Sequence, residues 1–165
     1  MFENIDLDVK LSKDEYNKVI DLMEVRLGEL QRQARDLGIP VLIVFEGWDA
    51  SGKGTLINKL ILPIDPRGFT VYSIDSPTKD EEEHPFFWRF WVKTPARGRM
   101  SIFSHSWYAR MMEERLRGLP NRDLHTKYYT KINSFERQLF RDGVVIIKLF
   151  LHISKKEQKK RLEKL

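Results

Sequence analysis

The chain has 165 residues, of which 41% are hydrophobic and 32% are charged, as is typical of one globular domain with its own core. It contains no cysteine, which excludes disulfides and thiolate metal sites, and it has no apolar run long enough to span a bilayer. Lysine and arginine exceed aspartate and glutamate by 29 to 24, which favours polyanionic partners. Because no signal-peptide pattern opens the chain, we expect a cytoplasmic protein.

The first predicted element is a long amphipathic helix. Ser12 and Glu15 have the spacing of a capping box, and apolar residues then recur at helical spacing over residues 16–37. Gly38 ends the pattern. We expect residues 1–38 to form a helical arm whose apolar stripe contacts the core or another subunit.

A phosphate-binding loop is predicted over residues 45–55, between an apolar β-branched run and a helical pattern. Its G-x-x-x-x-G-K spacing lets backbone N–H groups converge on phosphate oxygens, because Gly47 and Gly52 can adopt dihedrals that a side chain forbids. The helix that follows adds its positive dipole end, and Lys53 would reach the terminal phosphates. The alternative is a glycine-rich turn that binds nothing.

Two positions in this loop are unusual. Gly54 stands where many such loops carry the hydroxyl that ligates magnesium, and Thr55 comes one residue later. Asp49 puts a carboxylate against a bound polyanion, which is costly unless the carboxylate holds a cation or accepts a proton. We therefore predict a metal-binding or acceptor-activating role for Asp49.

A second strand is predicted over residues 69–74, and it ends at the polar segment 75–78. Ligands of open α/β sheets bind at the carboxyl ends of strands, so this segment should lie near the loop. Asp75 is a candidate outer ligand of a metal there, and helix capping by Asp75 or Thr78 is an equal alternative. Residues 79–83 are interpreted as a solvated charge run.

Residues 84–93 combine five aromatic residues with two cations in a predicted helix. Alternating aromatic and basic residues can stack on nucleic-acid bases. We prefer a bulky core helix with Arg89 and Lys93 at its solvent edge.

A short buried strand is predicted over residues 100–103, leading to Ser104 and His105. In phosphate-loop enzymes a strand of this kind usually delivers a carboxylate to the metal, and here that carboxylate is absent. Helices are predicted from Ser106 and again over about 121–140.

The last predicted elements are a buried strand over residues 144–151 and a basic helix. Lys148 within the strand must snorkel or pair. Ser154 and Glu157 form a capping-box pattern that opens the helix, and the helical pattern continues to the last residue, so we expect a truncated lid.

Several of these motifs, in this order, resemble the family-2 polyphosphate kinases over nearly the whole chain. They are the loop 45–55, the turn 65–69, Pro77 with Thr78, the segment 84–91, Ser106-Trp107-Tyr108 with Arg110, Glu114 and Arg115, and the segment 151–154. The arrangement resembles most the polyphosphate:AMP phosphotransferase branch, which includes polypeptides with two fused domains of this kind.

The resemblance implies a three-layer α/β fold of the phosphate-loop NTPase class, similar to thymidylate kinase, with a mostly parallel central sheet. One kinase-like domain would consist of the arm 1–38, a core over 39–153 and the start of a lid over 154–165. The implied activity is phosphoryl transfer between inorganic polyphosphate and a nucleoside mono- or diphosphate (AMP/ADP or ADP/ATP) with Mg²⁺. We expect a cytoplasmic homo-oligomer with no nucleic-acid or membrane partner.

By position, the resemblance makes Asp49, Lys53 and Arg110 the expected catalytic residues and Asp49 also the metal ligand. The expected phosphate- and nucleotide-binding residues are Gly47, Trp48, Ala50, Ser51, Gly52, Gly54, Thr55 and Arg115. Phosphoryl transfer depends mostly on positioning and on neutralising charge, which agrees with this set.

Three departures from the family pattern favour weak activity in the isolated chain. Ser104 and His105 replace the usual metal-binding aspartate and the adjacent arginine, Ser76 replaces a lysine, and the lid is short. A second hypothesis is therefore a degenerate domain that binds polyphosphate or nucleotide, or serves as an assembly partner, with little catalysis. A third is an ATP-dependent nucleoside monophosphate kinase, which the loop alone would support. Nucleic-acid binding ranks last.

Overall fold

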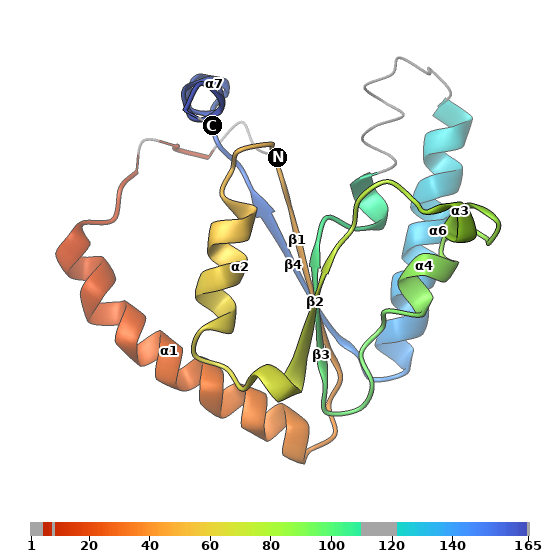
Figure 1. The fold of residues 1–165 in the computed structure, drawn as a ribbon, viewed down its shortest axis with the longest axis horizontal. Coiled ribbons are helices and arrows are strands. Elements are labelled where there is room, and N and C mark those ends of the chain that lie inside the picture. The colour runs from red at the N-terminus through yellow and green to blue at the C-terminus, as the bar shows by residue number, and fades with distance from the viewer. Residues whose placement is uncertain (1–4, 8, 110–121, 165) are drawn as a thin grey trace.

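A parallel sheet with helices on both faces forms the framework of the computed structural model (Figure 1), which describes residues 5–7, 9–109 and 122–164. The strands are β1 (Val41–Gly47), β2 (Phe69–Ser73), β3 (Met100–Ser104) and β4 (Val145–Leu151), in the order β2-β3-β1-β4. All three neighbouring pairs are parallel, so their carboxyl ends meet at one edge of the sheet. The predicted three-layer, parallel α/β architecture is confirmed.

The helices divide between the two faces of the sheet (Figure 1). They are α1 (Lys13–Asp36), α2 (Lys53–Ile61), α3 (Lys79–Glu82), α4 (Trp88–Trp91), α6 (Arg122–Arg141) and α7 (Lys155–Leu162), with a short 3₁₀ turn η1 (Pro66–Gly68) before β2. α1 and α2 lie on one side, and α4 and α6 on the other. No helix in the described part of the chain is long and apolar enough to cross a bilayer.

Strand β1 is buried on both faces because its alternate residues enter two different clusters. Val41, Ile43 and Phe45 pack with Ile57 of α2, whereas the intervening side chains pack with a cluster that includes Phe135 of α6. This explains why the strand reads as a continuous apolar run. It also fixes the loop that follows β1 at the centre of the carboxyl edge.

Helix α1 begins with the predicted capping box. The Ser12 side chain accepts a hydrogen bond from the backbone of Glu15, and the Glu15 carboxylate accepts one from the backbone of Ser12. Only Gly28 and Gln31 are buried along the helix, and many of its apolar side chains are exposed, among them Leu22 at 73%. The second half of α1 therefore provides its contacts with the core.

The charge run 79–83 is largely exposed to solvent, as predicted, and residues 79–82 form a short helix, because Thr78 and Glu81 make a capping box. Two other local predictions were wrong. The helix predicted over 84–93 covers only residues 88–91. Strand β4 is largely exposed rather than buried, because it is an edge strand in the sheet order and the helices cover it incompletely.

Candidate active site

The predicted loop has the backbone conformation that its glycines indicated. Gly47 has φ 145° and Gly52 has φ 99°, and Gly52 is the N-cap of α2. A Cβ at Gly47 would lie 2.4 Å from the carbonyl oxygen of Leu151 in β4. Ala50, between them, adopts φ 57°, which is rare for a residue with a side chain. Such strained residues cluster at ligand-binding sites.

Lys53 is buried at the centre of this loop, with 9% of its surface exposed. Its ammonium donates hydrogen bonds to the carbonyl oxygens of Gly47 and Trp48 over 2.9 and 3.1 Å. An ammonium has three N–H donors, so one is left for a ligand. The lysine thus stands inside the loop.

The other predicted loop residues differ in exposure. Asp49, Gly54 and Thr55 are exposed, whereas Ser51 is buried. Among the described residues, the Ser51 hydroxyl has no hydrogen-bond partner. This orphaned hydroxyl is what a loop built to enclose an additional polar group would contain.

Helix α7 lies against the loop, which the sequence did not indicate. Arg161 donates to the carbonyl oxygens of Ala50 and Ser51 over 3.3 and 3.1 Å, and Gln158 donates to that of Asp49 over 3.1 Å. Glu157 accepts a bond from the Arg161 guanidinium over 2.7 Å. Three successive loop carbonyls are therefore held by α7.

Trp48 is held by a residue that follows β4. Its indole N–H donates to Nδ1 of His152 over 2.9 Å, and its ring meets that of Phe150 edge to face at 5.9 Å. Trp48, a predicted binding residue, therefore lies at the rim of the loop, with 38% of its surface exposed.

The end of β3 lies beside the loop, as expected for the strand that replaces the usual acid by Ser104. Ser104 is in register with Phe45 of β1. His105 follows with φ 64°, and its N–H donates to the carbonyl of Phe45 over 3.0 Å. The substituted positions thus stand at the carboxyl edge next to the loop.

Glu46 is a buried acid at this edge that the sequence reasoning missed. The Ser106 hydroxyl donates to its carboxylate over 2.5 Å, and Nδ1 of His105 lies 3.9 Å from it. Burial raises the pKa of Glu46 above its usual value, and the Ser106 hydrogen bond and the charge of His105 oppose the rise. The signal was present: Glu46 is an acid at the end of an otherwise apolar buried strand.

A cleft of about 800 Å³ opens beside the loop. Its described lining includes Asp49, Asp75, His105 and Arg89. Asp75 does not cap a helix, since Thr78 is the N-cap of α3. The cleft therefore joins the loop to the polar segment after β2, as the strand order requires.

The prediction that Arg89 lies at the solvent edge of its helix was wrong. It is buried, and its guanidinium donates to the carbonyl of Asp75 over 2.9 Å and pairs with Glu81 at 3.1 Å. Glu81 also pairs with Lys93 at 2.9 Å. The preferred core packing of the aromatic segment is confirmed, with Phe90 buried to 1% exposure. Arg89 faces the cleft because α3 provides the carboxylate that allows its burial.

Lys148 has the partners that its position in a strand required. Its ammonium donates to Glu136 of α6 over 2.8 Å and to the hydroxyl of Tyr108 over 3.1 Å. Two predicted residues, Arg110 and Arg115, lie outside the described part of the chain.

A strand, a glycine-rich loop around a buried lysine, and a helix that begins at the loop together define a phosphate-loop protein of the α/β class. The family model for polyphosphate kinase 2 matches residues 10–165. The chain belongs to the polyphosphate kinase 2 family.

Relatives and solved structures agree with this membership. The chain is 37% identical over 163 residues to a polyphosphate:AMP phosphotransferase of Pseudomonas syringae, covering 99% of this chain and 33% of that protein. It is 31% identical over 156 residues to a GDP-polyphosphate phosphotransferase of Mycolicibacterium smegmatis, covering 94% of this chain and 55% of the relative. A polyphosphate kinase 2 structure from Pseudomonas aeruginosa superposes with a TM-score of 0.92 at 36% identity, over 99% of this chain and 36% of that one. The chain thus spans about a third to about half of these relatives.

Proposed function

We propose that this chain moves a phosphoryl group between inorganic polyphosphate and a nucleoside mono- or diphosphate. The observation that carries the proposal is the loop closed around Lys53 beside a cleft that contains Asp49. Family membership supports polyphosphate as one substrate, and the names of relatives include AMP, ADP and GDP.

In the proposed reaction the terminal phosphoanhydride bond of polyphosphate breaks and a new P–O bond forms to an oxygen of the nucleotide's phosphate. Polyphosphate becomes one phosphate shorter. The loop N–H groups and Lys53 would hold the donor chain and neutralise its charge, because phosphoryl transfer depends on positioning and charge stabilisation. An arriving phosphate can accept the third N–H of the Lys53 ammonium directly, and further contacts with this ammonium would displace loop carbonyls.

Magnesium is the cofactor that we propose, with Asp49 as its protein ligand. Mg²⁺ is commonly held by one or two carboxylates together with substrate phosphates, and Asp49 and Asp75 both line the cleft. Among the described residues, no group of three or more acidic or histidine side chains could hold an ion by itself. The site therefore fits a metal that arrives with its phosphates, where it would neutralise their charge.

We propose that Arg110 is a further catalytic residue and that Arg115 binds phosphate. The exposed apolar side chains of α1 support the expected homo-oligomer, because such a surface usually contacts another polypeptide. A cytoplasmic location and the absence of membrane and nucleic-acid partners belong to the same proposal.

The test is to incubate the chain with Mg²⁺, long-chain polyphosphate and either AMP or ADP, and to separate the nucleotide products by ion-exchange chromatography. Lys53→Ala should lower the rate of transfer by about 100-fold or more, as removal of one charge-stabilising group typically does. Lys59→Ala, an exposed lysine of the same helix, is the matched control and should leave the rate unchanged. Transfer from ATP but not from polyphosphate would instead favour a nucleoside monophosphate kinase.

The second candidate, a domain that binds but scarcely catalyses, is favoured by Ser104 and His105. Their place at the carboxyl edge is where a metal-binding acid would act. If this candidate holds, the wild-type chain should bind polyphosphate with little turnover, and Ser104→Asp combined with His105→Arg should raise the rate greatly. A substantial rate in the wild-type chain would rule it out.

A further inference from the structure

We propose that a pocket at the amino end of the sheet is a second binding site for inorganic polyphosphate. This arginine pocket has a volume of about 250 Å³. It is lined by Gln31, Arg32, Arg35, Asp65, Arg67, Gly68, Gly98 and Arg99. The inference goes beyond the proposed function, because it concerns a different end of the molecule.

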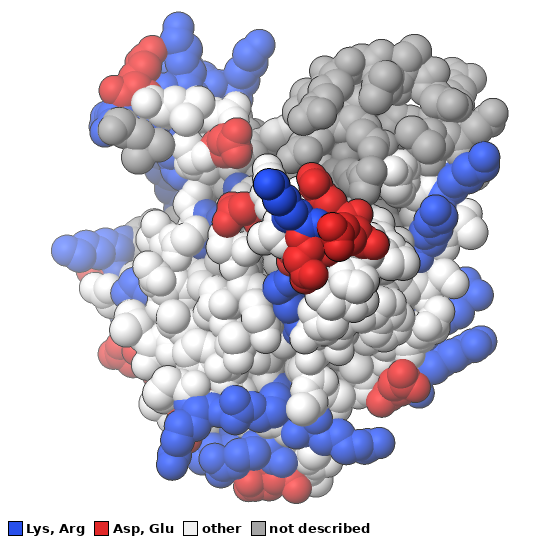
Figure 2. Space-filling model, turned by 45° about the vertical axis from the view of Figure 1, so that its right-hand side comes forward, with Lys and Arg blue, Asp and Glu red and all other residues white. Residues whose placement is uncertain are grey.

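The location follows from the strands. Arg99 directly precedes β3, and its carbonyl accepts a hydrogen bond from the N–H of Val41 at the start of β1. The phosphate-binding loop follows the other end of β1. At about 3.3 Å per residue, the length of this strand separates the two regions by about 20 Å. Figure 2 shows lysine and arginine gathered at the lower end of the molecule, where α1 ends and β2 and β3 begin in Figure 1.

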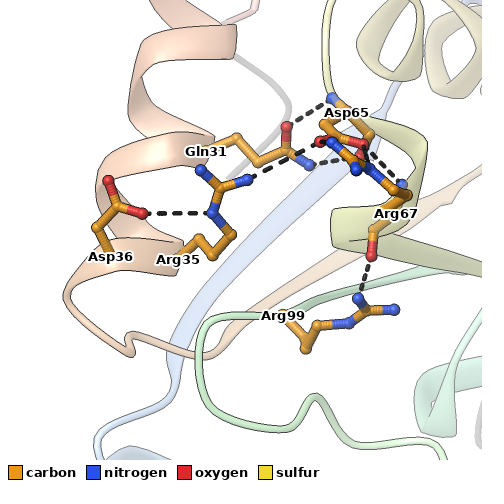
Figure 3. A network of polar contacts seen from close by, with 6 residues as sticks. All are labelled: Gln31, Arg35, Asp36, Asp65, Arg67 and Arg99. Carbon is orange, nitrogen blue, oxygen red and sulfur yellow. Dashed lines mark hydrogen bonds and ion pairs between the residues drawn. The ribbon is translucent and has the colours of Figure 1, made fainter.

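Gln31 links α1 to the turn before β2 through its contacts with Asp65, as Figure 3 shows. This buried amide donates to the carbonyl of Asp65 over 2.9 Å and accepts from its N–H over 2.6 Å. Two glycines allow the walls to approach closely. A Cβ at Gly68 would lie 2.4 Å from the Gln31 amide, and one at Gly98, which has φ +69°, would lie 2.9 Å from the Arg35 carbonyl. The arginines are therefore mounted on three segments locked together.

The charges of the pocket are unbalanced. Asp65 is the one carboxylate among the described lining residues, and it pairs with Arg67 at 2.8 Å and with Arg35 at 3.8 Å. Arg35 also pairs at 3.3 Å with Asp36, outside the lining. Arg99 donates to the carbonyl of Arg67. Within the described part of the chain, neither Arg99 nor Arg32 has an ion-pair partner. Planar guanidinium groups can donate two parallel hydrogen bonds to a phosphate. The pocket therefore offers an anion at least two such bidentate donors, Arg32 and Arg99.

The lining also indicates which phosphate compound fits. Its described lining contains no aromatic and no large apolar side chain, so no aromatic ring there would stack on a base. Pockets for whole small molecules are typically about 300–1,000 Å³, whereas this one suits one phosphate group or two. Arg67, with 85% of its side chain exposed, lies at the rim, where further phosphates of a chain would follow. An inorganic phosphate chain satisfies each of these features.

A polyphosphate chain held here would be tethered to the protein away from its reacting end. Tethering raises the effective concentration of the free end near a second site. We therefore expect the arginine pocket to favour long chains over short ones.

The test is a titration of the isotopically labelled Lys53→Ala chain with sodium tripolyphosphate, followed by the backbone amide signals of Gly68 and Gly98. The Lys53 substitution weakens the loop site, so the two glycines report on the pocket. Saturable shifts are expected at both. Arg32→Ala with Arg99→Ala should raise the dissociation constant by about tenfold or more, because two charge-assisted contacts are lost.

The matched control is Lys131→Ala with Arg137→Ala, which removes the same charge from exposed positions of α6 and should change the constant by less than about twofold. Arg32→Lys with Arg99→Lys keeps the charge and the fold but removes the bidentate guanidinium donors. Its dissociation constant should lie between those of the parent chain and the double alanine variant. Equal weakening by the two alanine pairs would mean diffuse charge attraction and would overturn the proposal.

Three further ligands test the identity of the anion. Orthophosphate, AMP and a short single-stranded oligonucleotide should each shift Gly68 and Gly98 only at much higher concentration than tripolyphosphate. Equal binding of orthophosphate, or tighter binding of either nucleotide ligand, would refute a polyphosphate site. Because the readout is local, failure of nucleotide phosphorylation would leave this inference standing.

Discussion

The cleft at the carboxyl end of the sheet and the arginine pocket at its amino end differ in how their charges are partnered. Among the described residues, the cleft is lined by the carboxylates of Asp49, Asp75, Glu81 and Glu82 and by one guanidinium, Arg89. The described lining of the arginine pocket has four guanidinium groups and one carboxylate. The cleft therefore needs cations from elsewhere, such as a metal ion, before it can hold a polyanion. The pocket needs none.

The cations of the carboxyl end are also committed to the protein itself. Lys53 donates to two loop carbonyls, and Arg161 of α7 donates to two more. These bonds keep the loop in shape without ligand, and binding a phosphate means exchanging some of them. At the amino end, Arg99 makes a comparable bond to the carbonyl of Arg67, whereas no hydrogen bond or ion pair of Arg32 is found within the described residues. Anion binding at Arg32 should therefore depend more directly on charge.

The sharpest way to break the carboxyl end without touching the other is Gly47→Ala. The new Cβ would meet the backbone of Leu151 at 2.4 Å in a conformation with φ 145°, so neither partner can move aside cheaply. We expect the free energy of unfolding to fall by about 3 kcal/mol or more. Urea denaturation followed by circular dichroism measures this.

Gly68→Ala is the corresponding change at the amino end, and it should cost less, about 1–2 kcal/mol. The new Cβ would meet the side-chain amide of Gln31. This amide can rotate away, although it then loses its hydrogen bonds to Asp65. Gly143→Ala is the control for backbone strain alone, since it has φ +84° with no atom within 4 Å, and about 1 kcal/mol is expected. Equal losses at Gly47 and Gly143 would contradict the steric argument.

The free energy of unfolding should depend on pH through Glu46 at the carboxyl end, because the pKa of this buried acid is raised. Its raised pKa means that the folded state holds the proton more tightly than the unfolded chain does. Stability from this group is fully present below the ordinary glutamate pKa of about 4.3 and is lost as the pH rises through the folded-state pKa. Glu46→Gln should remove this fall, an effect of the order of 1 kcal/mol.

The measurement is the free energy of unfolding of wild type and Glu46→Gln as a function of pH. The Gln side chain can still accept the Ser106 hydrogen bond, so the two proteins should agree at low pH and diverge as the pH rises. Glu82→Gln, an exposed acid near the cleft, should follow the wild-type curve. A curve for Glu46→Gln that parallels wild type would show that Glu46 titrates normally.

The sequence allowed prediction of features that residue identity determines locally. Gly47 and Gly52 indicated a loop with unusual dihedrals, and β-branched residues indicated the strand before it. The Ser12 capping box located the start of α1. Motif order added the family and with it the parallel sheet, because the resemblance extends over nearly the whole chain.

Contacts between distant segments could not be predicted in this way. Arg161 reaches Ser51 across 110 residues and Gln31 reaches Asp65 across 34, and no local pattern encodes either pairing. Arg89 was placed at the solvent edge because a lone cation on a helix usually lies there. Its burial depends on Glu81, whose orientation is fixed by the helix α3 that composition alone did not reveal.

The smallest predicted effect concerns Asp65, the carboxylate that limits the anion affinity of the arginine pocket. Hydrogen bonds from the Arg67 side chain and backbone lower its pKa to about 2, so it is ionised at every pH above that, and its contribution is lost only as the pH falls through about 2. Asp65→Asn removes this negative charge while leaving an oxygen for the Arg67 N–H. Tripolyphosphate should then bind roughly two- to fivefold more tightly at low salt, as expected for one screened charge near the surface.

The measurement is a calorimetric titration of wild type and Asp65→Asn with tripolyphosphate. Asp21→Asn, which changes an exposed acid on α1 remote from the pocket, controls for the change in net charge. It should match wild type within error. The gain at Asp65 should shrink as salt is added, because the interaction is exposed to solvent. A weaker affinity in Asp65→Asn would mean that Asp65 serves mainly to aim Arg67 and Arg35. The pocket would then depend on the orientation of its guanidinium groups more than on its excess of positive charge.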